Sequence, residues 1–221
     1  MTTQEKDFVR IDFDVYSNGK LAQSTSQKTA ESAGLPKSKE YGPQVMIVGR
    51  NFFLKALDDD IKNAKIGEKR TLSLSVEEGF GKRKKEFIKT FPKKTFDEQK
   101  LRAVVGMVYD FNGMFGTVKS VVGGRVMIDF NNMYAGKELK IEYSILEVVK
   151  DIREKLSFIF TTILKMPETI FRITQKDKEI IVSIPKELHA MNDQLTKTFE
   201  DYLPEMKDYS FTFSVLDKPK K

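Results

Sequence analysis

The chain has 221 residues and a formal net charge of +6, and 40% of its residues are hydrophobic. This length suggests one or two domains, and the hydrophobic content excludes a chain that is disordered by composition. The absence of Cys excludes disulfides, thiol nucleophiles and thiolate metal sites. No apolar run reaches the ~20 residues of a membrane span, and the N-terminus lacks a signal-peptide pattern. We therefore expect a cytoplasmic protein without a membrane segment.

The N-terminal residues predict a β-hairpin. Positions 9, 11, 13 and 15 are apolar and alternate with charged residues, which is typical of a half-buried strand. The dipeptide Asn18-Gly19 accepts the positive φ angles of a tight turn, and residues 20–24 are the expected return strand. Residues 28–43 are polar and contain Ser, Gly and Pro, which predicts a loop.

The segment 48–81 predicts a short helix followed by a strand. Asn51 is a candidate N-cap, and Phe53, Leu54, Leu57 and Ile61 share one helix face. The run Asp58–Asp60 lies where the helix dipole disfavours negative charge, so we expect a short helix with an acidic surface patch. Alternation over residues 72–76 then predicts a strand, which ends at the corner Gly79-Phe80-Gly81.

Residues 90–132 predict a small β-unit after the charged connector Lys82–Lys85. Strands are expected near residues 104–111, 114–121 and 125–130, joined by turns at Asn112-Gly113 and Gly123-Gly124. The apolar residues around the turn at Asn112-Gly113 are either core of this unit or an exposed patch, and the sequence leaves both possibilities open. They are Met107, Val108, Tyr109, Phe111, Met114 and Phe115.

A further strand is predicted over residues 139–145, and the last third has a pattern of its own. Helix spacing over residues 152–163 and 188–199 predicts two amphipathic helices. Between them, residues 171–174 and 180–184 predict a hairpin, and residues 209–215 predict a final strand. The order is α-β-β-α-β.

The blocks 48–81 and 129–148 resemble the FKBP family of peptidyl-prolyl isomerases. The resemblance implies an α+β fold in which an antiparallel sheet wraps around one short helix. The block 131–139 resembles the return from the insert-in-flap domain of the SlyD-like branch, and the last third is similar to that of long archaeal FKBPs. The implied domains are 1–89 plus 133–150 (isomerase), 90–132 (insert, a chaperone domain) and 151–221 (α+β).

The resemblance also implies a proline-binding pocket. Its catalytic residues would be Phe13, Phe53, Leu54, Leu57, Phe80 and Ile141, with Gln23, Tyr134, Met107, Tyr109, Phe111, Met114 and Phe115 contacting substrate. Four positions depart from the family pattern: Ala22 and Ile141 replace common aromatics, Gln23 replaces Asp, and Phe80 replaces a Tyr whose phenol donates a hydrogen bond.

The implied activity is isomerisation of X-Pro bonds in unfolded or nascent polypeptides, without a cofactor. The alternative is a chaperone or peptide-binding module whose isomerase pocket is weakened or inactive, motivated by the four departures. No metal is expected, because His189 is the only His and the C-terminal tail, 216–221, lacks the His-rich pattern of SlyD-like proteins. The basic residues leave ribosome contact open, but neither a nucleic acid nor a membrane partner is expected.

Overall fold

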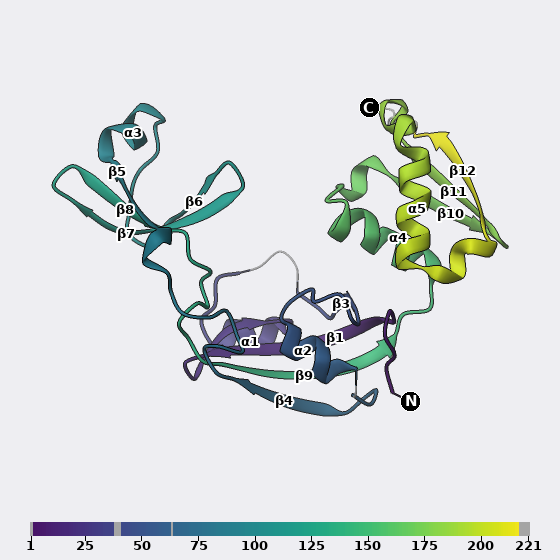
Figure 1. Ribbon diagram of the computed structural model, residues 1–221, viewed down its shortest axis with the longest axis horizontal. Coiled ribbons are helices and arrows are strands. Elements are labelled where there is room, and N and C mark those ends of the chain that lie inside the picture. Colours follow the sequence, from purple (N-terminus) through teal and green to yellow (C-terminus); the bar gives the residue numbers. More distant parts are fainter. Residues whose placement is uncertain (1, 38–40, 63, 217–221) are drawn as a thin grey trace. The chain divides into compact units, whose positions relative to one another are not determined.

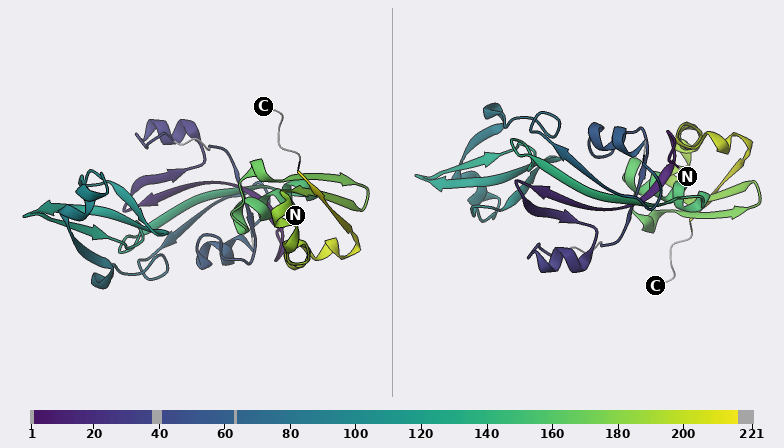
Figure 2. Two further views of the ribbon diagram at one scale, coloured as in Figure 1. Left: turned by 90° about the horizontal axis from the view of Figure 1, so that it is seen from above. Right: turned by 90° about the horizontal axis from the view of Figure 1, so that it is seen from below.

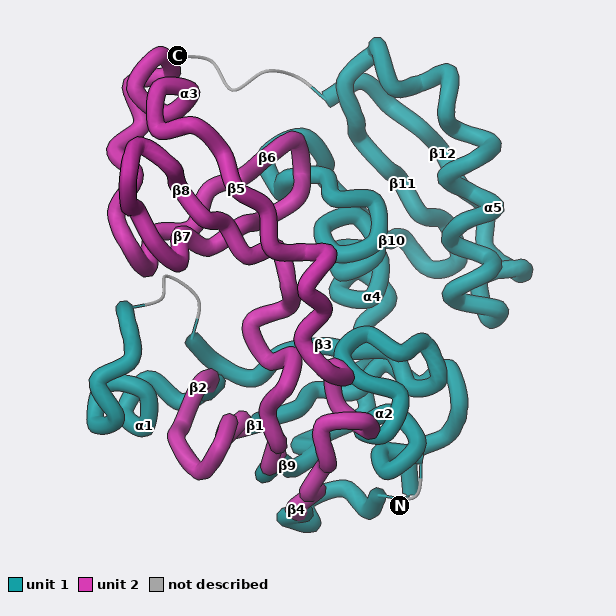
Figure 3. The backbone as a smooth tube through the Cα atoms, turned by 60° about the vertical axis from the view of Figure 1, so that its left-hand side comes forward, with its two compact units in different colours: residues 1–13, 24–70, 142–221 teal, residues 14–23, 71–141 magenta. Residues whose placement is uncertain are grey.

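The computed structural model describes residues 2–37, 41–62 and 64–216. Part of the predicted loop, residues 38–40, and part of the tail, residues 217–221, lie outside this description. The chain forms two compact units, coloured separately in Figure 3. The first comprises residues 1–13, 24–70 and 142–221, and the second comprises residues 14–23 and 71–141.

The largest sheet has five strands, four of them in the order β2-β1-β9-β4, and the short strand β3 pairs antiparallel with β1 (Figure 1). The long strands β1 and β9 run side by side in the views of Figure 2 as well. The strands predicted from alternation are confirmed, whereas β3 was missed. Their bounds are Phe8–Ser17 (β1), Lys20–Ser24 (β2), Gln44–Ile47 (β3), Lys69–Leu74 (β4) and Leu139–Val148 (β9).

Two short helices belong to the same part of the chain. Helix α1, Gln27–Ser32, lies inside the predicted loop, and that part of the prediction is wrong. Its N-cap Ser26 accepts a hydrogen bond from the Thr29 N–H, which stabilises a helix too short to be recognised from periodicity. Helix α2, Lys55–Ile61, has seven residues and is as short as expected.

The insert forms a four-stranded antiparallel sheet in the order β5-β8-β7-β6. Its buried core consists of Phe96 from α3 and Val118, Val126 and Ile128 from the sheet. Gly116 lies on the same face, where an added Cβ would approach Ile128 Cγ2 too closely. Strand β5 and helix α3 were not predicted. The bounds are Ile88–Pro92 (β5), Lys93–Glu98 (α3), Val108–Phe111 (β6), Met114–Val122 (β7) and Arg125–Asp129 (β8).

The C-terminal segment has the predicted α-β-β-α-β order. Strands β10 and β11 are antiparallel, and β12 returns parallel to β11. Helix α4 continues into a π-helical turn over Ile159–Ile163, and α5 starts later than predicted because Lys186–Met191 is a 3₁₀ helix. The bounds are Ile152–Phe158 (α4), Arg172–Lys176 (β10), Glu179–Ile184 (β11), Asn192–Tyr202 (α5) and Ser210–Val215 (β12).

None of the helices in the described ranges is both long and apolar enough to cross a membrane.

Candidate functional site

In the first unit, four of the six predicted catalytic residues gather around the start of α2. Phe13 of β1 and Phe53 of the loop before α2 have ring centroids 6.4 Å apart. Leu54 is the residue that precedes the helix, and Leu57 lies in its first turn; both are buried. The rings of Phe13 and Phe53 and the side chains of Leu54 and Leu57 thus gather at the N-terminal end of α2.

The loop before α2 is held by Asp58 and not by Asn51. Asn51 is not the N-cap; it has φ 50°, and no side chain caps the helix. The buried Asp58 carboxylate instead reaches back and accepts hydrogen bonds from the N–H groups of Gly49 (2.8 Å) and Asn51 (3.2 Å). A carboxylate that accepts backbone hydrogen bonds fixes both bonded segments, so Asp58 sets the course of the chain that carries Phe53.

Asp60 fastens the other end of α2. Its carboxylate accepts hydrogen bonds from Arg70 Nε (3.0 Å) and Nη2 (2.7 Å), on β4, and from the Tyr143 hydroxyl (2.5 Å), on β9. Burial alone would raise the pKa of Asp60, but these hydrogen bonds lower it below its ordinary value. Burial and the Asp60 carboxylate raise the pKa of Tyr143. The expected acidic surface patch is therefore wrong for Asp58 and Asp60, and only Asp59 is exposed.

Thr25 fixes the backbone of Phe13, a role that the sequence did not reveal. The buried Thr25 hydroxyl accepts from the Phe13 N–H at 3.0 Å and donates to Asp12 Oδ1 at 2.9 Å. The Thr25 N–H in turn donates to the Phe13 carbonyl at 3.0 Å. Gln23 and Ala22 precede this clamp on β2 and are half-buried.

In the second unit, Phe80 lies against Tyr134. The two ring centroids are 5.5 Å apart and the rings are inclined by 31°. Tyr134 is buried, and its burial raises its pKa. The corner before Phe80 is stabilised by Glu78, whose carboxylate accepts from Ser75 N (3.0 Å) and Oγ (2.7 Å). Ile141 is fully buried on β9 and shares its strand face with Tyr143.

The predicted substrate residues of the insert divide between core and surface. Tyr109 and Phe111 pack against the insert core, each with an edge-on contact to Phe96. Met107, Met114 and Phe115 are exposed, with 44%, 63% and 67% of their surface accessible. The two possibilities left open by the sequence therefore both occur, and strand alternation accounts for Phe115, which points to the face opposite Gly116.

The C-terminal segment packs on the loop before α2, within the first unit. Phe158 of α4 makes an edge-on contact with Phe52, at 5.5 Å between centroids, and with Phe8 of β1, at 5.8 Å. Arg50 stacks over the Tyr202 ring at 4.7 Å and donates to the Asp201 carbonyl at 3.1 Å. The buried residues of the segment form one cluster with Phe8, Ile47 and Val149. The loop that carries Phe53 is thus supported by Asp58 from one element and by the C-terminal segment from another.

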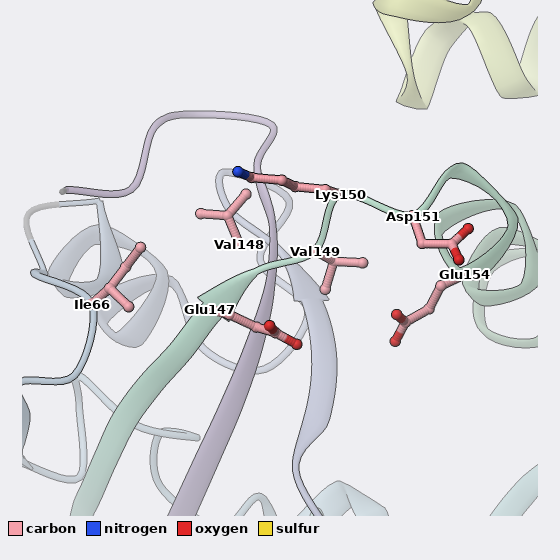
Figure 4. A pocket seen from close by; sticks show the side chains of 7 residues that line it. All are labelled: Ile66, Glu147, Val148, Val149, Lys150, Asp151 and Glu154. Carbon is pink, nitrogen blue, oxygen red and sulfur yellow. The ribbon is translucent and has the colours of Figure 1, made fainter.

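An open hollow of about 490 Å³ lies where β9 leads into α4 (Figure 4). Glu147 and Glu154 point into it, and Arg10 bridges the two carboxylates at 2.8 and 2.6 Å. One guanidinium thus pairs with both carboxylates, and this bridge joins β1 to the end of β9 and to α4. Within the described ranges, no three His, Asp or Glu side chains are grouped as metal ligands.

Comparison with known proteins agrees with this geometry. Residues 1–97 match the profile of the FKBP-type peptidyl-prolyl cis-trans isomerases, and residues 89–134 match that of the FKBP26 IF domain. A probable FKBP-type 16 kDa peptidyl-prolyl cis-trans isomerase of Pseudomonas fluorescens is 30% identical over 111 residues, which cover 48% of this chain and 73% of the relative. The chain belongs to the FKBP-type peptidyl-prolyl cis-trans isomerases. The family inferred from the sequence is confirmed.

Two other relatives are also named peptidyl-prolyl cis-trans isomerases. The short-type peptidyl-prolyl cis-trans isomerase of Methanocaldococcus jannaschii is 27% identical over 143 residues, which cover 64% of this chain and 91% of the relative. The FKBP-type isomerase SlyD of Helicobacter pylori is 29% identical over 112 residues, which cover 49% and 60%. The α+β fold and the isomerase activity expected from the sequence are thus supported by relatives from both SlyD-like and archaeal FKBPs.

We predict that Tyr143→Phe makes this isomerase less stable in a pH-dependent way. The folded-state pKa of Asp60 is lowered, so its ionised form contributes stability above the unfolded pKa of about 4 and loses it as pH falls through the folded value. Removing the hydroxyl should cost about 1.5–3 kcal/mol near pH 7, as for hydrogen bonds to charged groups. Urea unfolding at pH 7 and at pH 3 measures whether the difference shrinks in acid.

The control is Tyr109→Phe, whose hydroxyl donates to the neutral Arg102 carbonyl. It should have the same effect at both pH values. A loss for Tyr143→Phe that is equal at pH 7 and pH 3 would contradict the assigned role of the Asp60 charge.

We also predict that Phe158→Ala lowers isomerase activity although Phe158 lies outside the pocket. The change removes the rings' contact with Phe52 and should loosen the loop that carries Phe53. We expect kcat/KM for a short X-Pro peptide to fall about threefold, which corresponds to a loss of under ~1 kcal/mol of transition-state stabilisation. A protease-coupled peptide assay measures it.

Phe171→Ala is the matched control. Phe171 stacks on Phe160 at 4.4 Å within the C-terminal core. Both variants should lose about 2–4 kcal/mol of folding stability, as for other large-to-small core changes. Equal peptide kinetics in the two variants would show that the C-terminal segment does not act on the loop.

Proposed function

We propose that the chain isomerises X-Pro bonds of unfolded polypeptides in an apolar pocket and holds those polypeptides on its insert. The observation that carries the first part is the group formed by the Phe13–Phe53 pair with the buried Leu54 and Leu57 at the start of α2. Prolyl isomerisation must overcome a barrier of about 18–20 kcal/mol that arises from amide resonance, and it breaks no bond. It therefore needs no nucleophile, metal or cofactor.

An apolar pocket can lower this barrier by excluding water. The planar amide is more polar than the twisted one, so water stabilises the planar ground state, and an environment without water favours the twisted state. In our proposal, six side chains form this environment. They are Phe13, Phe53, Leu54, Leu57, Phe80 and Ile141. Gln23 replaces a carboxylate in this role and contributes no negative charge.

We assign to Tyr134 the hydrogen bond that Phe80 cannot donate. Tyr134 lies against Phe80, and its ring is buried. Burial raises the pKa of its phenol, so the hydroxyl keeps its proton and can donate a hydrogen bond. A phenol next to the corner aromatic supplies the donor that this family's pattern puts on the corner residue itself. No observation favours the alternative of an inactive pocket.

Tyr134→Phe should therefore reduce kcat/KM for a short X-Pro peptide about three- to tenfold, which corresponds to the loss of one hydrogen bond of about 1 kcal/mol. Adding Phe80→Tyr to this variant should restore most of the activity, because the donor returns on the neighbouring ring. The protease-coupled assay measures both, and thermal unfolding checks that the fold is kept. If the single variant has wild-type kinetics, Tyr134 is only a packing residue.

The second part of the proposal assigns client binding to the insert. Met107, Met114 and Phe115 are exposed there, whereas Tyr109 and Phe111 would support them from the core. Flexible Met side chains and flat rings suit the binding of many sequences. A client held on the insert would present its prolines to the pocket at a raised effective concentration. The proposed domains are 1–89 plus 133–150, 90–132 and 151–221.

Deleting residues 90–132 should weaken the catalysed refolding of a proline-limited protein about tenfold or more, and should change short-peptide isomerisation far less. Phe115→Ser, which leaves the insert core in place, should act in the same direction, and Phe111→Leu should act weakly if at all. Refolding kinetics and the peptide assay are compared for each variant. Equal losses in both assays would rule out the division of labour between pocket and insert.

The proposal places the protein in the cytoplasm, where its clients include nascent chains, and leaves room for a ribosome contact. Arg83 and Lys82 of the basic connector are paired with Asp129 and Glu77. Lys84 and Lys85 are the exposed charges that remain for such a contact.

A further inference from the structure

The net charge of the chain is concentrated in one segment. Residues 82–132 contain 11 of the 38 Lys and Arg residues and five of the 32 Asp and Glu residues. Their excess of six positive charges equals the net charge of the whole chain, and the remaining residues balance at 27 of each sign. The insert and its connector are therefore the basic part of an otherwise neutral protein.

Most of these cations have no acidic partner. Arg83 pairs with Asp129, Lys82 with Glu77, Lys93 with Asp97 and Lys94 with Glu98. Seven further cations of the segment are exposed, and no ion pair joins them to a described residue. They are Lys84, Lys85, Lys89, Lys100, Arg102, Lys119 and Arg125.

The insert sheet has one covered face and one open face. Val118, Val126 and Ile128 point to the core that α3 covers, and all are fully buried. The strand register places the residues that alternate with them on the opposite face. Four apolar side chains on that face are exposed: Val108, Phe115, Val122 and Met127, with 57%, 67%, 75% and 39% of their surface accessible.

Cations lie next to these apolar side chains. Arg125 is the direct cross-strand partner of Val122. Lys119 is the extra residue of a bulge in β7, between Val118 and Ser120, and is exposed. Asp110, the cross-strand partner of Phe115, is a carboxylate on the same face, and it accepts a hydrogen bond from the Gly113 N–H. The open face thus combines apolar anchors with more cations than carboxylates, and no ion pair joins Lys119 or Arg125 to a described residue.

From this arrangement we infer that the insert selects unfolded segments in which apolar side chains are flanked by Asp and Glu. The inference rests on the proposed chaperone function and names the class of client. Apolar anchors supply affinity for any unfolded chain, whereas unpaired cations favour acidic neighbours and disfavour basic ones. Such attraction between exposed groups is weak for each pair and is screened by salt.

The test uses the full chain and two extended peptides with identical apolar residues, one with Glu and one with Lys at the intervening positions. At low salt the Glu peptide should bind roughly five- to tenfold more tightly, and at 0.5 M salt the two should converge. Lys119→Glu combined with Arg125→Glu should abolish or reverse the preference. Lys197→Glu with Lys207→Glu, an equal charge change on the exposed surface of the C-terminal segment, should leave it unchanged.

The outcomes separate this inference from the function on which it rests. Equal affinity of the two peptides at low salt overturns the selectivity and leaves the chaperone function standing. If neither peptide binds, the chaperone function fails as well. If a single-stranded RNA displaces the Glu peptide at near-stoichiometric amounts, the cations serve a nucleic acid and the inference is overturned.

Discussion

The buried carboxylate of Asp58 is the group on which the candidate pocket depends. It stands in the helix that carries Leu57, and it accepts hydrogen bonds from the N–H groups of Gly49 and Asn51 in the preceding loop. A charge removed from water is costly unless it is hydrogen-bonded, so this carboxylate strongly favours the one loop conformation that supplies its donors. That conformation puts Phe53 next to Phe13. The two hydrogen bonds from the Gly49 and Asn51 N–H groups thus fix the position of the apolar side chains at the start of this seven-residue helix.

A second set of contacts holds the insert to its neighbouring chain. The Asn131 amide group donates to the Lys84 carbonyl at 3.0 Å and accepts from the Lys84 N–H at 2.8 Å. The Asp129 carboxylate pairs with Arg83 and accepts from Asn131. The two connections of the insert are therefore fastened to each other.

The sequence predicted the long strands because each has one buried face. Alternation in β1, β4 and β9 follows from that burial and needs no other information. It failed for β3, which has only four residues, and for α3, where Phe96 is the one buried side chain. Elements this small take their structure from neighbours that are distant in sequence, and a local pattern does not contain those neighbours.

The candidate site shows the same limit at the level of single residues. Three consecutive aspartates have identical side chains, yet Asp58 is buried, Asp59 is exposed and Asp60 lies between Arg70 and Tyr143. The sequence suggested one acidic patch, because the donors that distinguish them come from β4, β9 and the preceding loop. The pocket's apolar residues could be named from a family resemblance, whereas the polar residues that position them could not.

The departures from the family pattern at Ala22, Gln23, Phe80 and Ile141 affect prolyl isomerisation less than comparable changes would affect a reaction that makes a covalent bond. A hydrolase that loses its nucleophile loses its reaction step, because a covalent bond must be made. Prolyl isomerisation requires only that the amide be removed from water and twisted. Each side chain of the pocket therefore lowers the barrier by a part, and none is indispensable. Ile141 remains fully buried and apolar where an aromatic would stand. Phe80 keeps the ring and has a phenol beside it in Tyr134. The apolar side chains of such a site can therefore be substituted one at a time without abolishing the reaction. The hydrogen-bond donor can likewise be supplied by a residue of a neighbouring strand or turn.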